Sequence, residues 1–210
     1  MARVTADISM SIDGYVTGPD DSRVLPMGVD GHRLHQWIYD LATWRARVGL
    51  DGGRANRDAE ILDEGFASVG AHVIGRRMYD HGEKPWGDEP PFGLPVFVVT
   101  HEPRPTLELA GGTRFEFVPE GVESAVSRAL AAAGGRDVSV LGGANVIRQC
   151  LRAGLLDEVV LHVVPVLMGH GVRLFDKTHD GQVELPISRV EQPDQVVHLW
   201  LTPRAFSAGR

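Results

Sequence analysis

The stretch DVSVLGGANVIRQCLRAG, residues 137–154, contains a strand pattern, a glycine pair and a helix pattern in direct succession. Asp137–Leu141 reads as a strand, and a helix is expected from Ala144 to Ala153, with Gly154 placed to end it. Open α/β sheets bind phosphate-bearing ligands where the carboxyl end of a strand meets the start of a helix. In isolation, however, a glycine pair is more typical of a simple tight turn.

A second junction of this kind lies at Val73–Arg77, VIGRR, where a short buried strand ends in Gly75. Glycine lets the backbone turn sharply and approach a ligand closely. If Arg76 and Arg77 open a helical turn, its free N–H groups favour a phosphate, and the guanidinium groups add suitable donors. The alternative is a pair of solvated surface arginines. Two such junctions in one acidic chain favour a ligand with several phosphates, such as a dinucleotide.

The rest of the chain also alternates between strand and helix patterns, which is typical of an α/β sheet protein. Strands are predicted at Val4–Met10, Ala71–Gly75, Pro95–Thr100, Arg114–Val118, Asp137–Leu141, Asp157–Val166, Val183–Val190 and Val196–Thr202. Helices are predicted at His32–Val48, Asn56–Val69, Gly121–Ala133 and Ala144–Ala153, and long loops at Ser11–Asp30 and Gly82–Leu94. We therefore predict one domain over residues 1–210, with a single central, mostly parallel sheet of about eight strands, flanking helices and a C-terminal antiparallel strand pair.

The composition restricts the class of protein. The 210 residues are 43% hydrophobic and 23% charged, as in an ordinary globular protein, and the net charge of -7 argues against a general nucleic-acid or anionic-membrane binder. Cys150 is the only cysteine, which excludes an intrachain disulfide and a multi-cysteine zinc site. The nine histidines show no HxxxH or HExxH spacing, so no metal site is predicted. No apolar run approaches the roughly 20 residues of a membrane helix and no signal-peptide pattern is visible, so a cytoplasmic protein is expected.

Five segments, in this order, resemble the dihydrofolate-reductase-like superfamily: SMSIDGY (9–15), VIGRRMY (73–79), PVFVVTHEPR (95–104), VLGGANVIRQCL (140–151) and LLDEVVLHVVPVLMGHGVRLF (155–175). Within it, the chain resembles the branch related to the C-terminal reductase domain of the bifunctional riboflavin-biosynthesis deaminase/reductase. The matches span roughly Val4 to Phe175 and are more specific for the fold and the cofactor than for the substrate. The resemblance implies an NADPH-dependent reductase of a small-molecule substrate that forms a homodimer.

The resemblance also implies which residues hold the cofactor. By motif, the turn at the phosphates is formed by Gly75, Arg76, Arg77 and Met78, and the residues near the adenosine 2′-phosphate are Thr100 and His101. The loop against the pyrophosphate is formed by Gly142, Gly143, Ala144, Asn145 and Val146. Backbone groups at the first-strand exit, including Ser9 and Val16, hold the nicotinamide carboxamide. Position 78, often threonine in the family, is Met78, which removes a hydroxyl donor. We therefore expect weaker or altered cofactor binding.

The sequence offers two candidates for the proton donor. Asp40 lies three residues after Trp37 and four before Trp44, so a continuous helix would place it beside both rings, where its pKa could be raised. A solvated carboxylate at the helix edge is the plainer interpretation. Asp13, placed by its motif near the nicotinamide, is the rival candidate, although Asp-Gly is also a common turn. Trp37 and Trp86 are candidate substrate contacts, while tryptophan more often serves core packing.

These observations predict an NADPH-dependent oxidoreductase that transfers a hydride to a C=N or C=O bond of a small heterocyclic substrate, either riboflavin-pathway-like or pteridine-like. The alternative is a non-catalytic nucleotide-binding or dimerising module that kept the fold, which Met78 and the lack of a firm acid favour. The reductase interpretation requires Gly75 and Gly142 to share one cleft.

Overall fold

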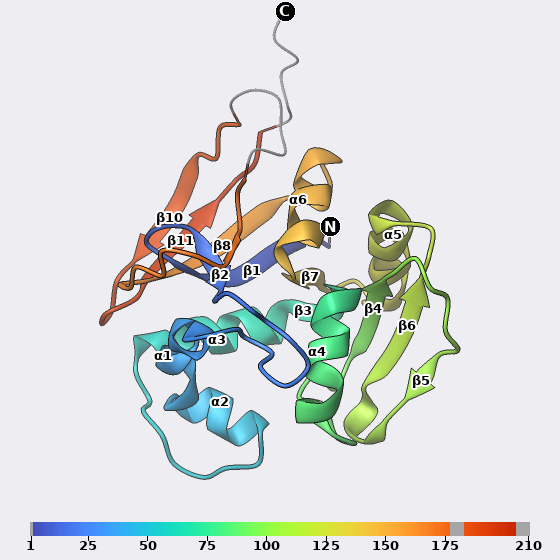
Figure 1. Cartoon of the computed structure of the whole chain (residues 1–210), viewed down its shortest axis with the longest axis horizontal. Coiled ribbons are helices and arrows are strands. Elements are labelled where there is room, and N and C mark those ends of the chain that lie inside the picture. Colours follow the sequence, from blue (N-terminus) through green and yellow to red (C-terminus); the bar gives the residue numbers. More distant parts are fainter. Residues whose placement is uncertain (1, 177–182, 205–210) are drawn as a thin grey trace, which may run out of the picture.

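A single sheet of nine strands organises the protein, whose computed structural model describes residues 2–176 and 183–204 (Figure 1). The strand order is β10-β11-β8-β1-β7-β3-β4-β6-β5. All neighbours from β8 to β6 run parallel, whereas β10 and β11 at one edge and β5 at the other are antiparallel. The predicted α/β class, with a mostly parallel central sheet and a C-terminal antiparallel pair, is confirmed.

The strands of the sheet are β1 (Val4–Ser11), β3 (Val69–Gly75), β4 (Pro95–Val99), β5 (Leu107–Glu108), β6 (Arg114–Val118), β7 (Asp137–Gly142), β8 (Glu158–Val164), β10 (Ile187–Glu191) and β11 (Val197–Leu201). A separate ribbon pairs β2 (Tyr15–Thr17) with β9 (Val172–Arg173). The helices are α1 (Gln36–Tyr39), α2 (Ala42–Arg47), α3 (Arg57–Ser68), α4 (Arg76–Trp86), α5 (Val122–Ala132) and α6 (Ala144–Arg152), with short 3-10 helices η1 (Gly31–Leu34) and η2 (Ala110–Gly112).

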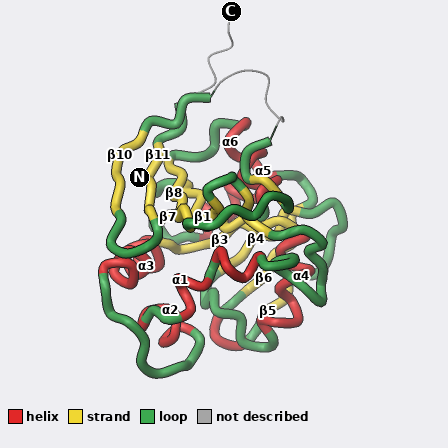
Figure 2. The backbone as a smooth tube through the Cα atoms, turned by 60° about the vertical axis from the view of Figure 1, so that its left-hand side comes forward, coloured by secondary structure: helices red, strands yellow, loops and turns green. Residues whose placement is uncertain are grey.

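Helices cover both faces of the sheet, with α5 and α6 on one side and α1 to α4 on the other (Figures 1 and 2). The main core lies under α5 and α6, where Ala6, Val73 and Val140 of three adjacent strands are fully buried. A second core, rich in aromatic side chains, lies under α4 around Ile74 and Tyr79. The cysteine at position 150 is fully buried in the main core, as expected of a small apolar residue.

The predicted helix over residues 32–48 is wrong as a single element, because the chain forms η1, α1 and α2 there. The break is at Leu41, which is extended (φ -78°, ψ 136°) and fully buried. Leu34 and Trp37 pack near Val164 of β8, whereas α2 packs against α3. Helical spacing alone did not reveal that these apolar residues face different neighbours.

Two predicted loops also contain regular structure. The loop expected at 82–94 is helical up to Trp86, and α4 ends one residue after Pro85, which has no N–H to bond to the preceding turn. The loop expected at 11–30 contains β2, which forms only by pairing with β9, far away in the sequence. None of the described helices is long and apolar enough to cross a membrane.

Candidate functional site

Gly75 and Gly142 end neighbouring strands, and the register of β3 and β7 places Ile74 opposite Gly142. A Cβ added to Gly75 would lie 3.0 Å from Cγ2 of Val146 and 3.5 Å from the backbone nitrogen of Gly143. Gly142 has a φ of +126°, which favours glycine. The structure therefore brings the two glycine junctions together at one edge of the sheet.

Two helices start beside each other at this edge. Helix α4 begins directly after Gly75 and α6 directly after Gly143, so neither has a side-chain cap, and neither has an acidic residue in its first turn. The N–H groups of a first helical turn lack helical partners and attract anions. In α6, Ala144 and Val146 are buried while Asn145 is exposed, so the first turn is anchored by its small apolar side chains. The arrangement suits a ligand with more than one phosphate.

Arg76 links the start of α4 to the end of β4. Its guanidinium donates to Asp80 at 2.8 Å, to Glu102 at 3.0 Å and to Oγ1 of Thr100 at 3.3 Å. Thr100 is buried and also accepts a hydrogen bond from the backbone nitrogen of Glu102, while His101 is exposed in the same turn. Hydrogen bonding to Asp80 is the largest cause that raises the pKa of Arg76, so this group stays charged.

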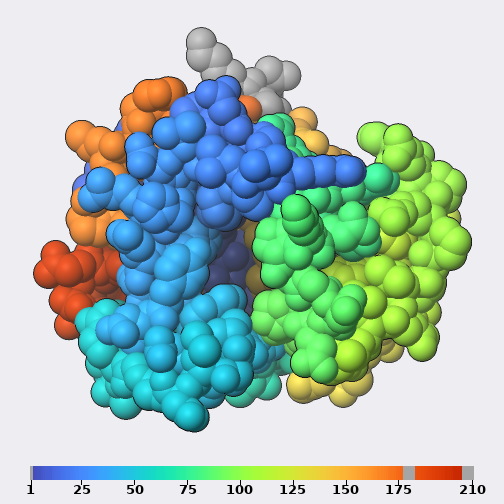
Figure 3. All heavy atoms as spheres, turned by 60° about the horizontal axis from the view of Figure 1, so that its bottom comes forward, coloured from blue at the N-terminus to red at the C-terminus, as the bar shows by residue number. Residues whose placement is uncertain are grey.

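Arg77 is exposed and holds the loop that follows β2. It donates to Asp21, whose other carboxylate oxygen lies 3.4 Å from Nδ1 of His81. Arg23 of the same loop lies 3.5 Å from Asp80. Figure 3 shows this blue loop reaching across to the green α4. Both arginines of the predicted phosphate turn are therefore held by carboxylates, and a bound phosphate would have to exchange with them.

Met78 fills the space between α4 and the end of β7. Its Sδ lies 3.9 Å from the position of a Cβ on Gly142, and its side chain is partly buried beside the second core. The thioether thus packs the two junctions together but supplies no O–H donor.

The side chains of Ser9 and Val16 are engaged in packing. Oγ of Ser9 accepts a hydrogen bond from Nε1 of Trp37 at 3.1 Å, and Val16 is buried in the main core. The pairing of β2 with β9 shifts its register between Tyr15 and Thr17. Any contact of these two positions with a ligand would therefore be made by the backbone, as the family resemblance implies.

Asp13 fastens the loop after β8 to the end of β1. Its carboxylate accepts from Oγ of Ser11 at 2.6 Å and from the backbone nitrogens of Met168 and Gly169 at 3.1 and 2.7 Å. The hydrogen bond from Ser11 is the largest cause that lowers the pKa of Asp13 to about 2. At neutral pH this group is an anion with no proton to donate, so the structure does not support it as the catalytic acid.

Asp40 lies at the end of α1, 64% exposed and paired with Arg54 at 3.1 Å. Because the helix ends there, Asp40 does not lie between two indole rings: the ring of Trp37 faces His162, and that of Trp44 faces Tyr39. The geometry on which an acid role for Asp40 rested is absent from the described structure.

The two candidate substrate tryptophans have different surroundings. Trp86 packs edge-on against Phe92 at 4.9 Å and stacks on Phe115 at 6.1 Å, beside the second core. Trp37 lies against His162 and His198, at 4.9 and 5.2 Å between ring centroids. The structure therefore does not bring the two indoles together, and the partly buried Trp86 packs against the second core.

Four residues that the sequence analysis missed form a chain of hydrogen bonds beneath Trp37. Nε2 of His162 lies 3.0 Å from Asp7, the two Nδ1 atoms of His162 and His198 are 2.6 Å apart, and Nε2 of His198 lies 3.0 Å from Asp58. Both imidazoles and Asp58 are buried, while Asp7 is 35% exposed. The one sequence feature that could have indicated this chain is Asp7, a carboxylate in the middle of the predicted first strand.

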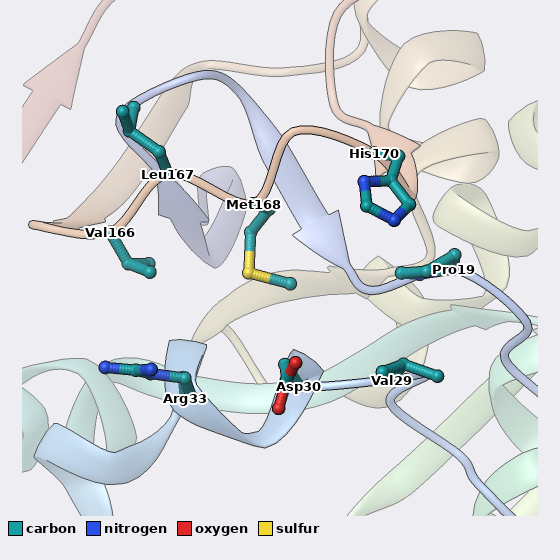
Figure 4. A pocket seen from close by; sticks show the side chains of 8 residues that line it. All are labelled: Pro19, Val29, Asp30, Arg33, Val166, Leu167, Met168 and His170. Atoms are coloured by element: carbon teal, nitrogen blue, oxygen red, sulfur yellow. The ribbon is translucent and has the colours of Figure 1, made fainter.

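Two depressions lie near these residues. Figure 3 shows a hollow between the segment α1 to α3 and α4, with dark blue atoms of the N-terminal region at its floor. A separate cavity of about 120 Å³ lies where Met168 and His170 face Val29 and Asp30 (Figure 4). It is smaller than the roughly 300–1,000 Å³ of a typical ligand pocket. Among residues 2–176 and 183–204, no group of three or more His, Cys, Asp or Glu side chains is arranged to hold a metal ion.

Comparison with known proteins relates most of the chain to one family. The chain is 26% identical over 165 residues to the uncharacterized protein YwjB of Bacillus subtilis (strain 168), covering 72% of this chain and 91% of that protein. It superposes on a candidate riboflavin biosynthesis protein from Shewanella sp. PV-4 with a TM-score of 0.67 and 20% identity, over 96% of this chain and 99% of that one.

A second solved structure is the diaminohydroxyphosphoribosylaminopyrimidine deaminase/5-amino-6-(5-phosphoribosylamino)uracil reductase of Thermotoga maritima. It matches with a TM-score of 0.59 and 14% identity over 97% of this chain and 57% of that one. The sequence profile of the family described as RibD C-terminal domain matches residues 2–199. The chain therefore belongs to the RibD C-terminal domain family.

Proposed function

We propose that this protein is an NADPH-dependent reductase that transfers a hydride to a C=N or C=O bond of a small heterocyclic substrate, riboflavin-pathway-like or pteridine-like. The observation that carries the proposal is the shared edge of Gly75 and Gly142, where two uncapped helices begin next to Arg76 and Arg77. Membership in the RibD C-terminal domain family supports an oxidoreductase. By the family resemblance we also propose that it acts as a homodimer in the cytoplasm.

The residues at this edge fit a phosphorylated dinucleotide. Arg76 and Arg77 would bind phosphate oxygens, the first turn of α6 from Gly143 to Val146 would bind the pyrophosphate, and Thr100 with His101 would lie near the 2′-phosphate. NADPH, when bound, supplies the hydride. The protein would orient the cofactor and exclude water from the site.

The test has two stages. Fluorescence titration of the full chain with NADPH and with NADH measures cofactor binding and preference, and the loss of NADPH absorbance is then followed with dihydrofolate, an aminopyrimidine ribityl compound, and small cyclic imines and carbonyl compounds. Saturable binding of NADPH together with its consumption supports the proposal. Failure to bind either nucleotide overturns it.

The second candidate function is a nucleotide-binding module without turnover. It is favoured by Met78, which places a thioether between the two junctions, and by the engagement of Asp13 and Asp40 in other contacts. Saturable NADPH binding with no consumption for any compound of the panel would support this alternative.

A further inference from the structure

The chain of hydrogen bonds from Asp7 to Asp58 connects four elements across one face of the sheet. Asp7 belongs to β1, His162 to β8, His198 to β11 and Asp58 to α3. Register brings the imidazoles together, because β8 and β11 pair His162 directly with His198. The ring of Trp37 lies against both imidazoles, and the two histidines have almost no exposed surface. Water is therefore kept from the middle of the chain.

To make all three of its hydrogen bonds, this chain needs one proton more than its side chains carry in their ordinary forms at neutral pH. Three contacts, Asp7–His162, His162–His198 and His198–Asp58, need one proton each. Two neutral imidazoles supply only two N–H protons, and ionised carboxylates supply none. With two protons, a nitrogen lone pair would face a carboxylate or another lone pair at hydrogen-bond distance. Three protons satisfy every contact and leave the four groups with a net charge of -1.

The third proton can move along the chain without any heavy atom moving. Each proton only has to shift from one side of its hydrogen bond to the other. The group that carries the extra proton is then one of the two imidazoles or one of the two terminal carboxyl groups. In one of these forms Asp7 is the protonated group, His162 donates to His198, and His198 donates to Asp58. The chain can thus present its proton at Asp7.

Asp7 is the open end of the chain. Its Oδ1 faces His162, whereas Oδ2 has no hydrogen-bond partner among residues 2–176 and 183–204. A Cβ added to Gly65 of α3 would lie 3.8 Å from Oδ2, so a glycine lies next to the carboxylate. With its exposed fraction of 35%, Asp7 is more accessible than the other three residues of the chain. It faces the same side of the sheet as Ser9, two residues further along β1, whose Oγ accepts a hydrogen bond from Nε1 of Trp37.

We propose that Asp7 is the proton-donating residue of the site, and that Asp58, His198 and His162 supply its proton as positioning residues. This inference rests on the proposed reductase function. A carboxyl group that contacts the substrate suits a C=N or C=O bond whose nitrogen or oxygen becomes basic as its carbon accepts a hydride.

The hydride leaves the nicotinamide with its electron pair and forms a C–H bond on the substrate carbon, and the π pair of the C=N or C=O bond moves to the nitrogen or oxygen. The carboxyl group of Asp7 turns about its Cβ–Cγ bond, which moves the protonated oxygen from His162 to the substrate, and that nitrogen or oxygen takes the proton. Asp7 is then an anion facing the lone pair of Nε2 of His162, which is an unfavourable contact, and a proton from water restores the chain.

Other titratable groups near the chain are neutral or distant from the proton. Burial lowers the pKa of His35, beside His162, and of His72, whose charged neighbours are Arg47 and Asp7, to about 4 in each case. Burial is also the largest cause that lowers the pKa of His198, with Asp58 acting in the opposite direction. A neutral amide, Asn56, donates to the outer oxygen of Asp58 at 3.0 Å. The carboxylates at the two ends of the chain, Asp58 and Asp7, oppose this lowering and favour the third proton.

The deciding experiment is NMR of the full chain labelled with ¹⁵N in its histidine rings. The wild type should show three protons on the contacts of His162 and His198 at neutral pH, with the shared Nδ1 proton strongly downfield. Asp7→Asn removes the anion beside His162. In this variant the third proton should be lost at a pH about 1–3 units lower than in the wild type. Glu60→Gln, an exposed carboxylate on α3 outside the chain, should leave the titration unchanged.

Two protons on the wild-type pair, or an unchanged titration in Asp7→Asn, would overturn the inference. Asp58→Asn provides a second variant at the other end of the chain. With any substrate that the wild type reduces, Asp7→Asn should lower turnover by about 10²–10⁴-fold at unchanged NADPH affinity. Wild-type turnover in this variant would also overturn it. Failure of NADPH to bind would instead reject the proposed function, while the proton count can be measured without any cofactor.

Discussion

Arg77 donates to Asp21, and this ion pair fastens the loop after β2 to the first turn of α4. Asp21 has only 8% of its side chain exposed, so the loop is packed down onto the helix. The same guanidinium is a predicted phosphate contact. The loop and a bound dinucleotide are therefore expected to compete for Arg77.

Replacing Asp21 tests this competition. In Asp21→Asn, Arg77 no longer has to leave a carboxylate, so NADPH should bind more tightly, by about 0.2–1 kcal/mol, since the guanidinium of this ion pair is exposed to solvent. The measurement is a fluorescence titration at low salt. Glu120→Gln removes a carboxylate that pairs with Arg128 away from the site and should leave the dissociation constant unchanged. Weaker binding in Asp21→Asn would show that the loop contact assists the cofactor.

Removing the arginines should have the opposite effect. Arg76→Ala and Arg77→Ala should each weaken NADPH binding, by about 1.5–3 kcal/mol for each charge-assisted hydrogen bond that is lost. The effect should be smaller for NADH if either arginine contacts the 2′-phosphate. Arg152→Ala removes an exposed arginine from the other end of α6 and is the matched control. Unchanged affinity in the double variant Arg76→Ala/Arg77→Ala would reject the phosphate turn.

The backbone conformation at Gly142 can be tested separately from the charges of Arg76 and Arg77. Gly142→Ala forces a residue with a Cβ to adopt a φ of +126°, which should lower the free energy of unfolding by about 1–2 kcal/mol. The added Cβ meets no atom closer than 3.8 Å, so the fold should persist. Gly121→Ala introduces similar strain, at φ +96°, before α5. Chemical denaturation should show comparable losses, and only Gly142→Ala should also weaken NADPH binding.

The hydrogen bonds of Asp13 predict a pH dependence of stability. Because its pKa is about 2 in the folded protein and 3.8 ordinarily, its contribution is fully present above about pH 4 and is lost as the pH falls towards 2. The difference in Tm between the wild type and Asp13→Asn should therefore shrink over this interval. Asp40→Asn, an exposed carboxylate paired with Arg54, should change Tm little at any pH. A constant difference for Asp13→Asn from pH 7 to pH 2 would contradict the assignment.

The sequence was sufficient for the fold because its main determinants are local. A strand that ends in Gly75 and another that ends in Gly142 are each visible within a few residues, and the intervening helices predict parallel strands. The carboxyl ends of parallel strands lie at the same edge of a sheet. For that reason two separate motifs indicated one common edge, and the register of β3 and β7 places them there.

The carboxylates of Asp7 and Asp13 have hydrogen-bond partners far away in the sequence, which the sequence alone did not predict. Asp13 and its partner Met168 are 155 residues apart, and Asp7 meets His162 at the same separation. Helical periodicity likewise predicted one helix through Asp40, whereas the extended and buried Leu41 separates α1 from α2. Periodicity describes only the faces of a single segment. A pKa depends on every group that packs against the carboxylate, and those groups come together only when distant strands pair.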